Sequence, residues 1–167
     1  MEAIEIREEQ TGDADAIRRV VTEAFGQPQE AQLVDALRNN CSDLLSLVAV
    51  DGQDIVGHIL FSPAFLGDVQ GMGLAPMAVS PARQRDGIGS ELVRAGLAKL
   101  EAQGCPFVIV LGHPDYYPRF GFGRASERGV RCEWDVPDDV FMLLVFDETT
   151  MRGVSGLARY RPELAQV

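Results

Sequence analysis

The sequence predicts an α/β (α+β) fold in which helices flank a single mixed sheet. Residues 17–25 and 88–100 carry apolar side chains at helical spacing. Two apolar runs on either side of Asp51-Gly52 indicate an antiparallel hairpin. A further run at residues 107–111 is short and continuous, which is typical of a buried parallel strand. Antiparallel and parallel pairing in one chain together predict a mixed sheet.

Length and composition favour one ordinary globular domain. The chain has 167 residues, of which 46% are hydrophobic and 24% are charged, so a single domain spanning residues 1–167 can bury a real core. No apolar run is long enough to cross a bilayer. The first residues carry acid where a signal peptide would carry base. We therefore expect a cytoplasmic protein that does not bind membranes.

The charge balance and the cysteines exclude other classes. The formal net charge is −10, which argues against a nucleic-acid partner, because phosphate neutralisation needs clustered Lys and Arg. Cys41, Cys105 and Cys132 are widely spaced and form no Cys-x-x-Cys pair, so neither a metal site nor a disulfide framework is expected. A phosphate ligand would have to be bound locally, by backbone amides and a few arginines.

The first forty residues predict a strand and two helices. Residues 3–7 alternate apolar and polar side chains, as a short strand does. Thr11 and Asp13 offer N-caps to a helix whose apolar stripe runs through residues 17–25. Apolar side chains between 33 and 37 predict a second, shorter helix that ends near residue 40.

The next segment predicts three strands. Residues 44–50 and 55–61 are rich in β-branched side chains and form the hairpin, while residues 62–70 predict a longer turn. The third strand is expected at residues 72–79. Pro76 inside it cannot donate to a ladder, so this strand should carry a bulge or lose pairing there. Backbone groups released in this way become available to a ligand.

The second half predicts a helix and shorter strands. Residues 88–103 form an amphipathic helix before Gly104, and with residues 107–111 they complete a βαβ-like unit. Residues 112–123 contain too many Gly and Pro residues for one regular element. Strands are further expected at residues 130–134, 140–146 and, in a weakly patterned tail, near residues 157–160.

The stretch Met77–Ser90 carries the functional signal. Gly87 and Gly89 lie where a loop becomes a helix, and exposed amides at a helix start bind phosphate. Spacing alone leaves a plain glycine-rich connector equally open. The Gly-Lys-Ser/Thr of a P-loop and the third glycine of a dinucleotide fingerprint are both missing from the sequence. What remains is a pyrophosphate site on a helix that follows an irregular strand.

Two motifs resemble those of the GCN5-related N-acetyltransferases (GNAT). The segment Gln84-Arg-Asp-Gly-Ile-Gly89 resembles the family's Gln/Arg-x-x-Gly-x-Gly/Ala signature, and Met77–Pro81 is similar to its preceding strand end. Tyr117-Pro-Arg-Phe-Gly-Phe122 resembles the later Tyr-x-x-x-Gly-Phe signature. The order of elements agrees over nearly the whole chain. The chain is most similar to a small bacterial subgroup of predicted acetyltransferases with a His-Pro-x-Tyr-Tyr stretch.

The resemblance implies a fold and a cofactor site. The implied fold is the acyl-CoA N-acyltransferase fold, a mostly antiparallel sheet of about seven strands with flanking helices. Its fourth and fifth strands splay apart around acetyl-CoA, and no metal takes part. The implied pyrophosphate site is the run of amides from Arg85 to Ser90, and the implied pantetheine site is the end of the fourth strand. The cofactor-binding residues are then Met77, Ala78, Val79, Arg85, Asp86, Gly87, Ile88, Gly89 and Ser90.

The activity implied by the resemblance is acetyl transfer. The protein would pass an acetyl group from acetyl-CoA to the primary amine of a small molecule or a protein by direct attack. The alternative is an acyl-CoA-binding module with regulatory or partner-binding duty and little turnover. The sequence leaves the acceptor unidentified, and both a monomer and a homodimer fit the resemblance.

Tyr117 is the candidate general acid. Attack by a neutral amine expels a thiolate, which a nearby proton donor stabilises. Tyr117 aligns with the tyrosine that serves this role in many relatives, five residues before Phe122. Tyr116 is adjacent, so an offset of one residue would exchange the two roles. The alternative is that both tyrosines pack against Phe120 and Phe122.

The base is less clearly indicated. His113 is the candidate base or positioning residue, since imidazoles exchange protons near neutrality, and His58 is a second candidate. The alternatives are a loop histidine bonded to backbone at position 113 and a satisfied core or surface histidine at position 58. Many relatives carry an asparagine before the tyrosine, whereas residues 110–115 here contain none.

Other polar residues have two interpretations. Arg83 and Arg85 are placed either to contact phosphates or to lie solvated in the loop. Trp134 and the acids between 135 and 139 form either a substrate rim or a solvated turn, and we favour the turn.

Overall fold

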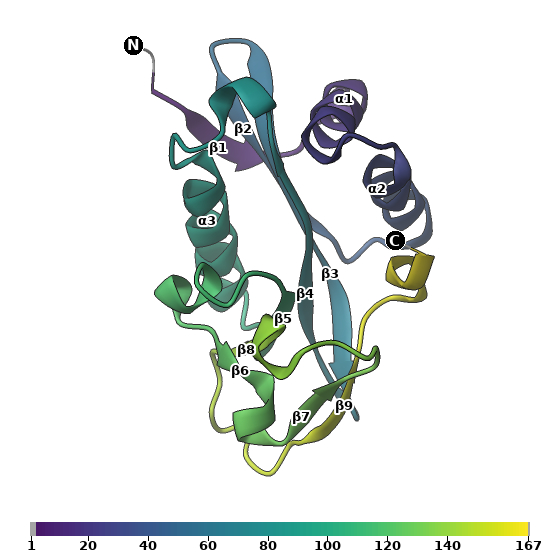
Figure 1. The fold of residues 1–167 in the computed structure, drawn as a ribbon, viewed down its shortest axis with the longest axis vertical. Coiled ribbons are helices and arrows are strands. Elements are labelled where there is room, and N and C mark those ends of the chain that lie inside the picture. Colours follow the sequence, from purple (N-terminus) through teal and green to yellow (C-terminus); the bar gives the residue numbers. More distant parts are fainter. Residues whose placement is uncertain (1–2, 167) are drawn as a thin grey trace. The chain divides into compact units, whose positions relative to one another are not determined.

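A computed structural model describes residues 3–166. Within this range nine strands form a mixed sheet in the order β1-β2-β3-β4-β5-β8-β6, with β9 paired to β3 and β7 paired to β9 (Figure 1). The β4–β5 and β7–β9 pairs are parallel, whereas β1–β2, β2–β3, β3–β9, β5–β8 and β6–β8 are antiparallel. The predicted mixed, mostly antiparallel sheet with flanking helices is confirmed.

The elements have the following bounds. The strands are β1 (Glu5–Glu8), β2 (Leu45–Asp51), β3 (Asp54–Leu66), β4 (Val69–Val79), β5 (Phe107–Leu111), β6 (Gly123–Arg124), β7 (Val130–Cys132), β8 (Phe141–Val145) and β9 (Gly156–Arg159). The α-helices are α1 (Ala14–Phe25), α2 (Gln29–Asn40) and α3 (Ile88–Ala102). Short 3₁₀ turns are η1 (Pro81–Arg83), η2 (Tyr117–Phe120), η3 (Ala125–Arg128), η4 (Asp138–Val140) and η5 (Pro162–Gln166).

The described chain divides into two compact units. The first contains the residues up to Phe61, Ala75–Leu97 and the segment from Pro162 onward. The second contains Ser62–Leu74 and Ala98–Arg161. Strands β3 and β4 and helix α3 each contribute residues to both units. The single domain expected over residues 1–167 stays a prediction.

In the first unit, helices cover both faces of the β2–β3 hairpin. Figure 1 shows α1 and α2 side by side, on the opposite side of β2 and β3 from α3. Successive β3 side chains point to opposite faces. A Cβ atom on Gly57 would lie 3.1 Å from Leu92 of α3, so this small residue lets the helix approach closely. The next residue, His58, faces the side of α2 and is fully buried.

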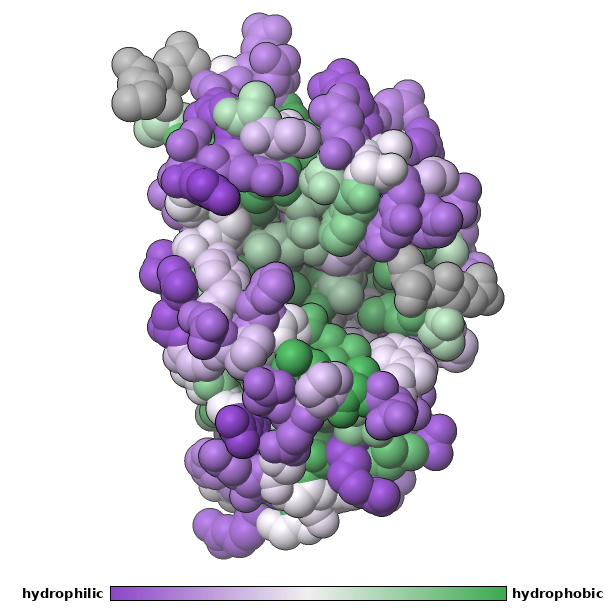
Figure 2. All heavy atoms as spheres, viewed as in Figure 1, coloured by the Kyte–Doolittle hydropathy of each residue, from purple (hydrophilic) through white to green (hydrophobic). Residues whose placement is uncertain are grey.

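The hairpin and the first helix follow the sequence pattern. Asp51 pairs with Asp54 across the predicted turn. Helix α1 buries Ile17 and exposes Arg18, and the outward sides of α1 and α2 are hydrophilic in Figure 2. Asp13 takes the N-cap position but makes no side-chain cap bond, contrary to expectation. The guanidinium of Arg7 donates to its carboxylate instead, at 2.8 Å.

In the second unit, β5 forms the centre of the local sheet. It pairs in parallel with β4 from Met72–Val108 to Leu74–Val110, and antiparallel with β8 over five residue pairs. The recorded β4–β5 register ends two residues before Pro76, as expected where a proline removes a ladder donor. The strand predicted in the weakly patterned tail is β9, which is parallel to β7.

One predicted loop is wrong. Strand β3 runs to Leu66, so the turn expected over residues 62–70 shrinks to Gly67 and Asp68. The extension is stabilised because Phe65 and Leu66 pair with β9, a contact between residues far apart in the sequence. Within residues 3–166 no helix is both long and apolar enough to cross a membrane.

Candidate active site

The predicted phosphate loop lies between β4 and α3 in the first unit. Ala78 at the strand end and Ile88 at the helix start are buried, whereas Arg85, Asp86 and Gly87 between them are exposed. Arg85 and Gly87 have positive φ values of 70° and 82°, which forms a tight turn. The buried residues at its two ends thus hold an exposed backbone turn at the start of a helix.

This turn presents backbone donors. The bond from the Glu91 N–H to the Gly87 carbonyl, at 3.1 Å, closes the first turn of α3. The N–H groups of Gly87, Ile88 and Gly89 precede it, in the region where a helix leaves amides without helical partners. A Cβ atom on Gly87 would meet nothing within 4 Å, so its surroundings are open. Amides and helix dipole together favour an anion at this position.

Arg83 stabilises the loop. Its guanidinium contacts Asp51 in the hairpin and donates to Asp86 at 3.3 Å. The hydrogen bonds that Arg83 donates, to Asp51 first and then to Asp86, raise the pKa of Arg83. The Gln84 amide donates to the Val79 carbonyl at 3.1 Å and ties the loop to the strand end. Of the two arginines considered from the sequence, Arg83 is therefore engaged by carboxylates, while Arg85 is exposed.

Tyr117 lies in an aromatic cluster of the second unit. Its side chain is 8% exposed and packs at ring-centroid distances of 5.0 Å from Tyr116 and 5.8 Å from Phe122. A Cβ atom on Gly112 would lie 2.2 Å from the Tyr117 ring, so a glycine is required there. Burial, with a contribution from Tyr116, raises the pKa of Tyr117 to about 12. The phenol is therefore protonated at neutral pH.

Tyr116 has a different environment. It is half-buried, and the guanidinium of Arg119 lies 4.7 Å above its ring. Arg119 also donates to the Tyr116 carbonyl at 3.0 Å. The two adjacent tyrosines are therefore distinguishable, and Tyr117 is the one whose ring is buried.

The two histidines have contrasting positions. His113 is exposed, and its carbonyl accepts hydrogen bonds from the N–H groups of Tyr116 and Tyr117, at 3.1 and 3.4 Å. Its backbone therefore builds the turn into η2. His58 is fully buried, and its Nε2 lies 2.9 Å from the Ser46 hydroxyl.

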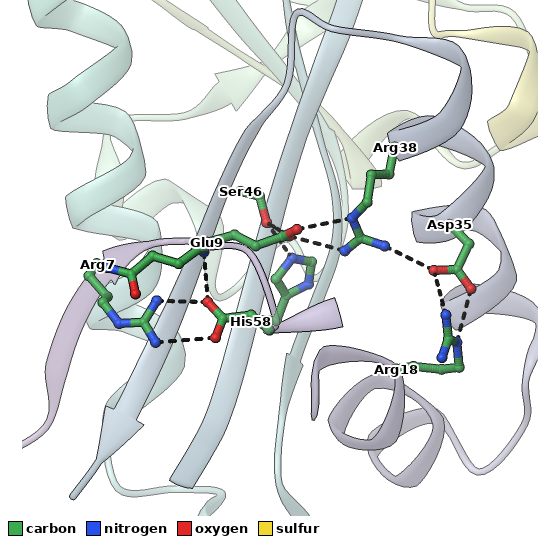
Figure 3. Close-up of polar contacts among 9 residues, drawn as sticks. Arg7, Glu9, Arg18, Asp35, Arg38, Ser46 and His58 are labelled. Atoms are coloured by element: carbon green, nitrogen blue, oxygen red, sulfur yellow. Dashed lines mark hydrogen bonds and ion pairs between the residues drawn. The ribbon is translucent and has the colours of Figure 1, made fainter. Parts of the chain in front are cut away.

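His58 ends a chain of polar contacts (Figure 3). Ser46 donates to Glu9 at 2.7 Å, and Arg38 of α2 donates to both oxygens of that carboxylate at 3.0 Å. Although burial opposes it, the bonds from Arg38 and Ser46 lower the pKa of Glu9, so Glu9 is a carboxylate that only accepts. Ser46 must then donate to Glu9, which leaves the His58 Nε2–H to donate to Ser46. Burial lowers the pKa of His58 to about 4.

Sequence reasoning assigned no role to Tyr160. This side chain is buried and stacks on Trp134, with ring centroids 5.2 Å apart and an interplanar angle of 17°. Trp134 also lines a pocket of about 220 Å³ with Asp135 and Asp138. The solvated turn favoured from the sequence for these residues stays a prediction. The signal available in the sequence was that Tyr160 is an aromatic residue at the end of a predicted strand. The partner of Tyr160 lies 26 positions earlier in the chain, too distant for local reasoning.

The predicted site residues fall into two groups. Met77–Val79 and Arg85–Ser90 belong to the first unit, whereas His113 and Tyr117 belong to the second. Across residues 3–166, no cluster of three or more His, Cys, Asp or Glu side chains could hold a metal ion.

Comparison with known proteins gives consistent results. Residues 14–122 match the family model described as "Acetyltransferase (GNAT) family". The chain is 35% identical over 158 residues to "Uncharacterized N-acetyltransferase YhbS" of Escherichia coli (strain K12), which covers 93% of this chain and 95% of the relative. It is 42% identical over 134 residues to "Uncharacterized N-acetyltransferase YjhQ" of the same organism, covering 76% of this chain and 74% of the relative.

Two crystal structures extend the comparison. YhbS from Escherichia coli in complex with CoA superposes with a TM-score of 0.92 at 33% identity, covering 97% of this chain and 92% of that one. A GNAT family acetyltransferase from Brucella melitensis in complex with acetyl-CoA gives a TM-score of 0.80 at 35% identity, covering 97% and 98%.

Proposed function

Because this chain belongs to the acetyltransferase (GNAT) family, we propose that it transfers an acetyl group from acetyl-CoA to a primary amine by direct attack. Two similar crystal structures hold CoA and acetyl-CoA, which supports the choice of donor. The observation that carries the proposal is the exposed backbone turn at the start of α3. Its geometry suits the pyrophosphate of CoA.

The proposed donor site has two parts. The amides of Arg85, Asp86, Gly87, Ile88, Gly89 and Ser90 bind the pyrophosphate, as the helix start favours an anion. Met77, Ala78 and Val79 at the end of β4 pair with the pantetheine arm in the manner of an added strand. In support, the Ala78 side chain is buried, which fixes the strand end.

Tyr117 is the proposed general acid. The amine nitrogen forms a bond to the acetyl carbon while the carbon–sulfur bond breaks, and the sulfur leaves with negative charge. A phenol with a pKa of about 12 remains protonated at neutral pH and donates to that sulfur. Because an ordinary thiol has a pKa of about 8.5, the phenol acts chiefly as a hydrogen-bond donor until the proton from the amine returns through solvent.

His113 is the proposed base or positioning residue for the amine. Its side chain is exposed next to η2, and histidine is the residue that most often serves as a general base. His58 is not proposed as the base, because it is fully buried and bonded to Ser46.

The activity can be tested by thiol release. Purified protein with acetyl-CoA is incubated with alkyl amines, diamines, amino sugars, amino acids and peptides, and free CoA is measured. Amine-dependent thiol release supports the proposal. Tight acetyl-CoA binding with no amine-dependent release would instead support a binding module. No rise in melting temperature at saturating acetyl-CoA would contradict both, since a ligand at 100 times its Kd stabilises by about 2.7 kcal/mol.

The role of the loop in donor binding can be tested by comparing two glycine variants. Gly87→Ala should raise the Kd for acetyl-CoA roughly five- to ten-fold, because an L side chain at positive φ costs about 1–2 kcal/mol and displaces the amides. Gly104→Ala is the matched control: Gly104 has φ 83° against 82° at Gly87, and neither Cβ would meet an atom within 4 Å. The control should lose similar stability without a change in Kd. Equal Kd values for the two variants would remove the loop from the donor site.

A further inference from the structure

The proposed pyrophosphate loop contains a negative charge of its own. Asp86 lies in the exposed turn between Arg85 and Gly87, with 55% of its side chain exposed. Aspartate side chains are ionised at neutral pH, so this carboxylate would repel a bound pyrophosphate. The net charge of −10 means that the protein as a whole does not offset that repulsion. Pyrophosphate binding at this loop is therefore favoured by a cation that binds Asp86.

Arg83 is the cation that binds this carboxylate. Its Nε donates to the Asp86 Oδ2 at 3.3 Å, and its Nη1 donates to Asp51, the last residue of β2. A guanidinium carries five donors in a rigid, planar group, so it can bind two carboxylates at once. The Arg83 side chain is only 27% exposed. Loss of this guanidinium would leave two uncompensated carboxylates, of which Asp86 is the one inside the turn.

The backbone fixes the position of Arg83. Its N–H donates to the Ser80 carbonyl, and the Ser80 N–H donates to the Val56 carbonyl of β3, both at 2.8 Å. The short turn η1 is therefore attached to the β2–β3 hairpin, which also supplies Asp51. All of these residues belong to the first unit. Arg83 thus links the hairpin to Asp86 in the exposed turn.

We propose that Arg83 is a positioning residue for donor binding: it holds and neutralises the Asp86 carboxylate, which leaves the loop amides to the pyrophosphate. This inference rests on the proposed donor site. Without Arg83, the Asp86 carboxylate opposes donor binding in two ways. Its charge repels the pyrophosphate, and it competes for the amides, because aspartate side chains readily accept hydrogen bonds at a helix start. Arg83 acts through Asp86 and does not contact the donor.

The first test is Arg83→Met, with the Kd for acetyl-CoA measured by titration calorimetry. At an ionic strength of about 0.01 M the Kd should rise roughly three- to ten-fold, as expected for one uncompensated charge near a dianion. At about 0.15 M the rise should be smaller, because the screening length falls from about 30 Å to about 8 Å. The melting temperature of the ligand-free variant should change little, since ion pairs near the surface contribute little to stability.

The decisive variant combines Arg83→Met with Asp86→Asn. It has the same net charge as the unaltered protein and no carboxylate in the turn, so its Kd should return to within about twofold of the original value. Arg18→Met is the matched control, because Arg18 also donates to two carboxylates, those of Asp15 and Asp35, in the same unit. The control makes the same change in net charge as Arg83→Met but should leave the Kd nearly unchanged.

Two results would overturn the role of Arg83. One is an unchanged Kd in Arg83→Met at the lower ionic strength. The other is a raised Kd that Asp86→Asn does not reverse, which would mean that Arg83 contacts the donor itself or only stabilises the fold. Failure of acetyl-CoA to raise the melting temperature of the unaltered protein would instead contradict the proposed function, so the two failures are distinguishable.

Discussion

His58 in the first unit and Tyr117 in the second are both buried titratable side chains, yet their surroundings differ in kind. His58 bonds Ser46, which bonds Glu9, which bonds Arg38, so charge is compensated along the chain of contacts. Tyr117 lies among aromatic rings and against a glycine. Burial shifts both pKa values toward the neutral form, to about 4 and about 12.

The difference shows how a structural group can be told from a functional one. The His58 network connects β2, β3 and α2 with Glu9, the residue that follows β1, and its removal should therefore affect stability. The aromatic cluster holds a phenol in place without using its hydroxyl to join elements, and the same is true of Tyr160. Stability should therefore depend on the first region and catalysis on the second.

The largest effect is expected for Tyr117→Phe. Loss of a positioned proton donor should lower kcat roughly 10²- to 10⁴-fold. The Kd for acetyl-CoA should be nearly unchanged, because the variant keeps the ring and its packing. Thiol-release kinetics and a binding titration measure the two quantities. Turnover equal to that of the unaltered protein would show that Tyr117 only packs against its neighbours. It would then contradict the assignment of catalysis to the aromatic cluster.

The next effect is the pH dependence of stability due to His58. Its pKa is about 4 in the folded chain against 6.5 in an unperturbed histidine, so the unfolded state binds more protons between these values. The contribution of His58 to the stability of the fold is then complete above pH 6.5, and it is lost as the pH decreases toward 4. Over this window the loss amounts to about 3 kcal/mol. The lowered pKa of Glu9 acts in the same direction at lower pH.

Urea denaturation at pH 7, 5.5 and 4.5 measures this dependence. His58→Gln should flatten the curve between pH 6.5 and 4.5, because an amide does not titrate. The facing charged groups, Glu9 and Arg38, stay in place in this variant. An equally steep curve in the variant would show that other groups cause the pH dependence.

The parts of the fold that were predicted correctly from the sequence depend on local chemistry. Asp51-Gly52 set the hairpin, and Gly87 with its neighbours set the turn before α3, because turn geometry is decided by the residues inside the turn. Burial at Ile17 and Leu92 follows from helical periodicity.

The features that were missed depend on distant partners. The extension of β3 requires β9, which lies almost a hundred residues later and pairs with Phe65. The surroundings of His58 include the charges of Glu9, which follows β1, and of Arg38, which lies in α2. Strand alternation identifies the face on which a histidine lies, but not the charges opposite it. The same reason explains why Tyr160 received no role.

The smallest effect is expected for Arg38→Met, which tests the stability side of the comparison. This variant leaves the half-buried Glu9 carboxylate without its guanidinium, so unfolding free energy should fall by about 2 kcal/mol, less than for a fully buried pair. Arg18→Met is the control: Arg18 contacts Asp15 and Asp35 at the surface with 48% exposure, and exposed pairs contribute at most about 1 kcal/mol. Turnover per folded molecule should be unchanged in both variants. A larger loss for Arg18→Met, or a fall in turnover for Arg38→Met, would mean that the His58 network does more than connect the elements of the first unit.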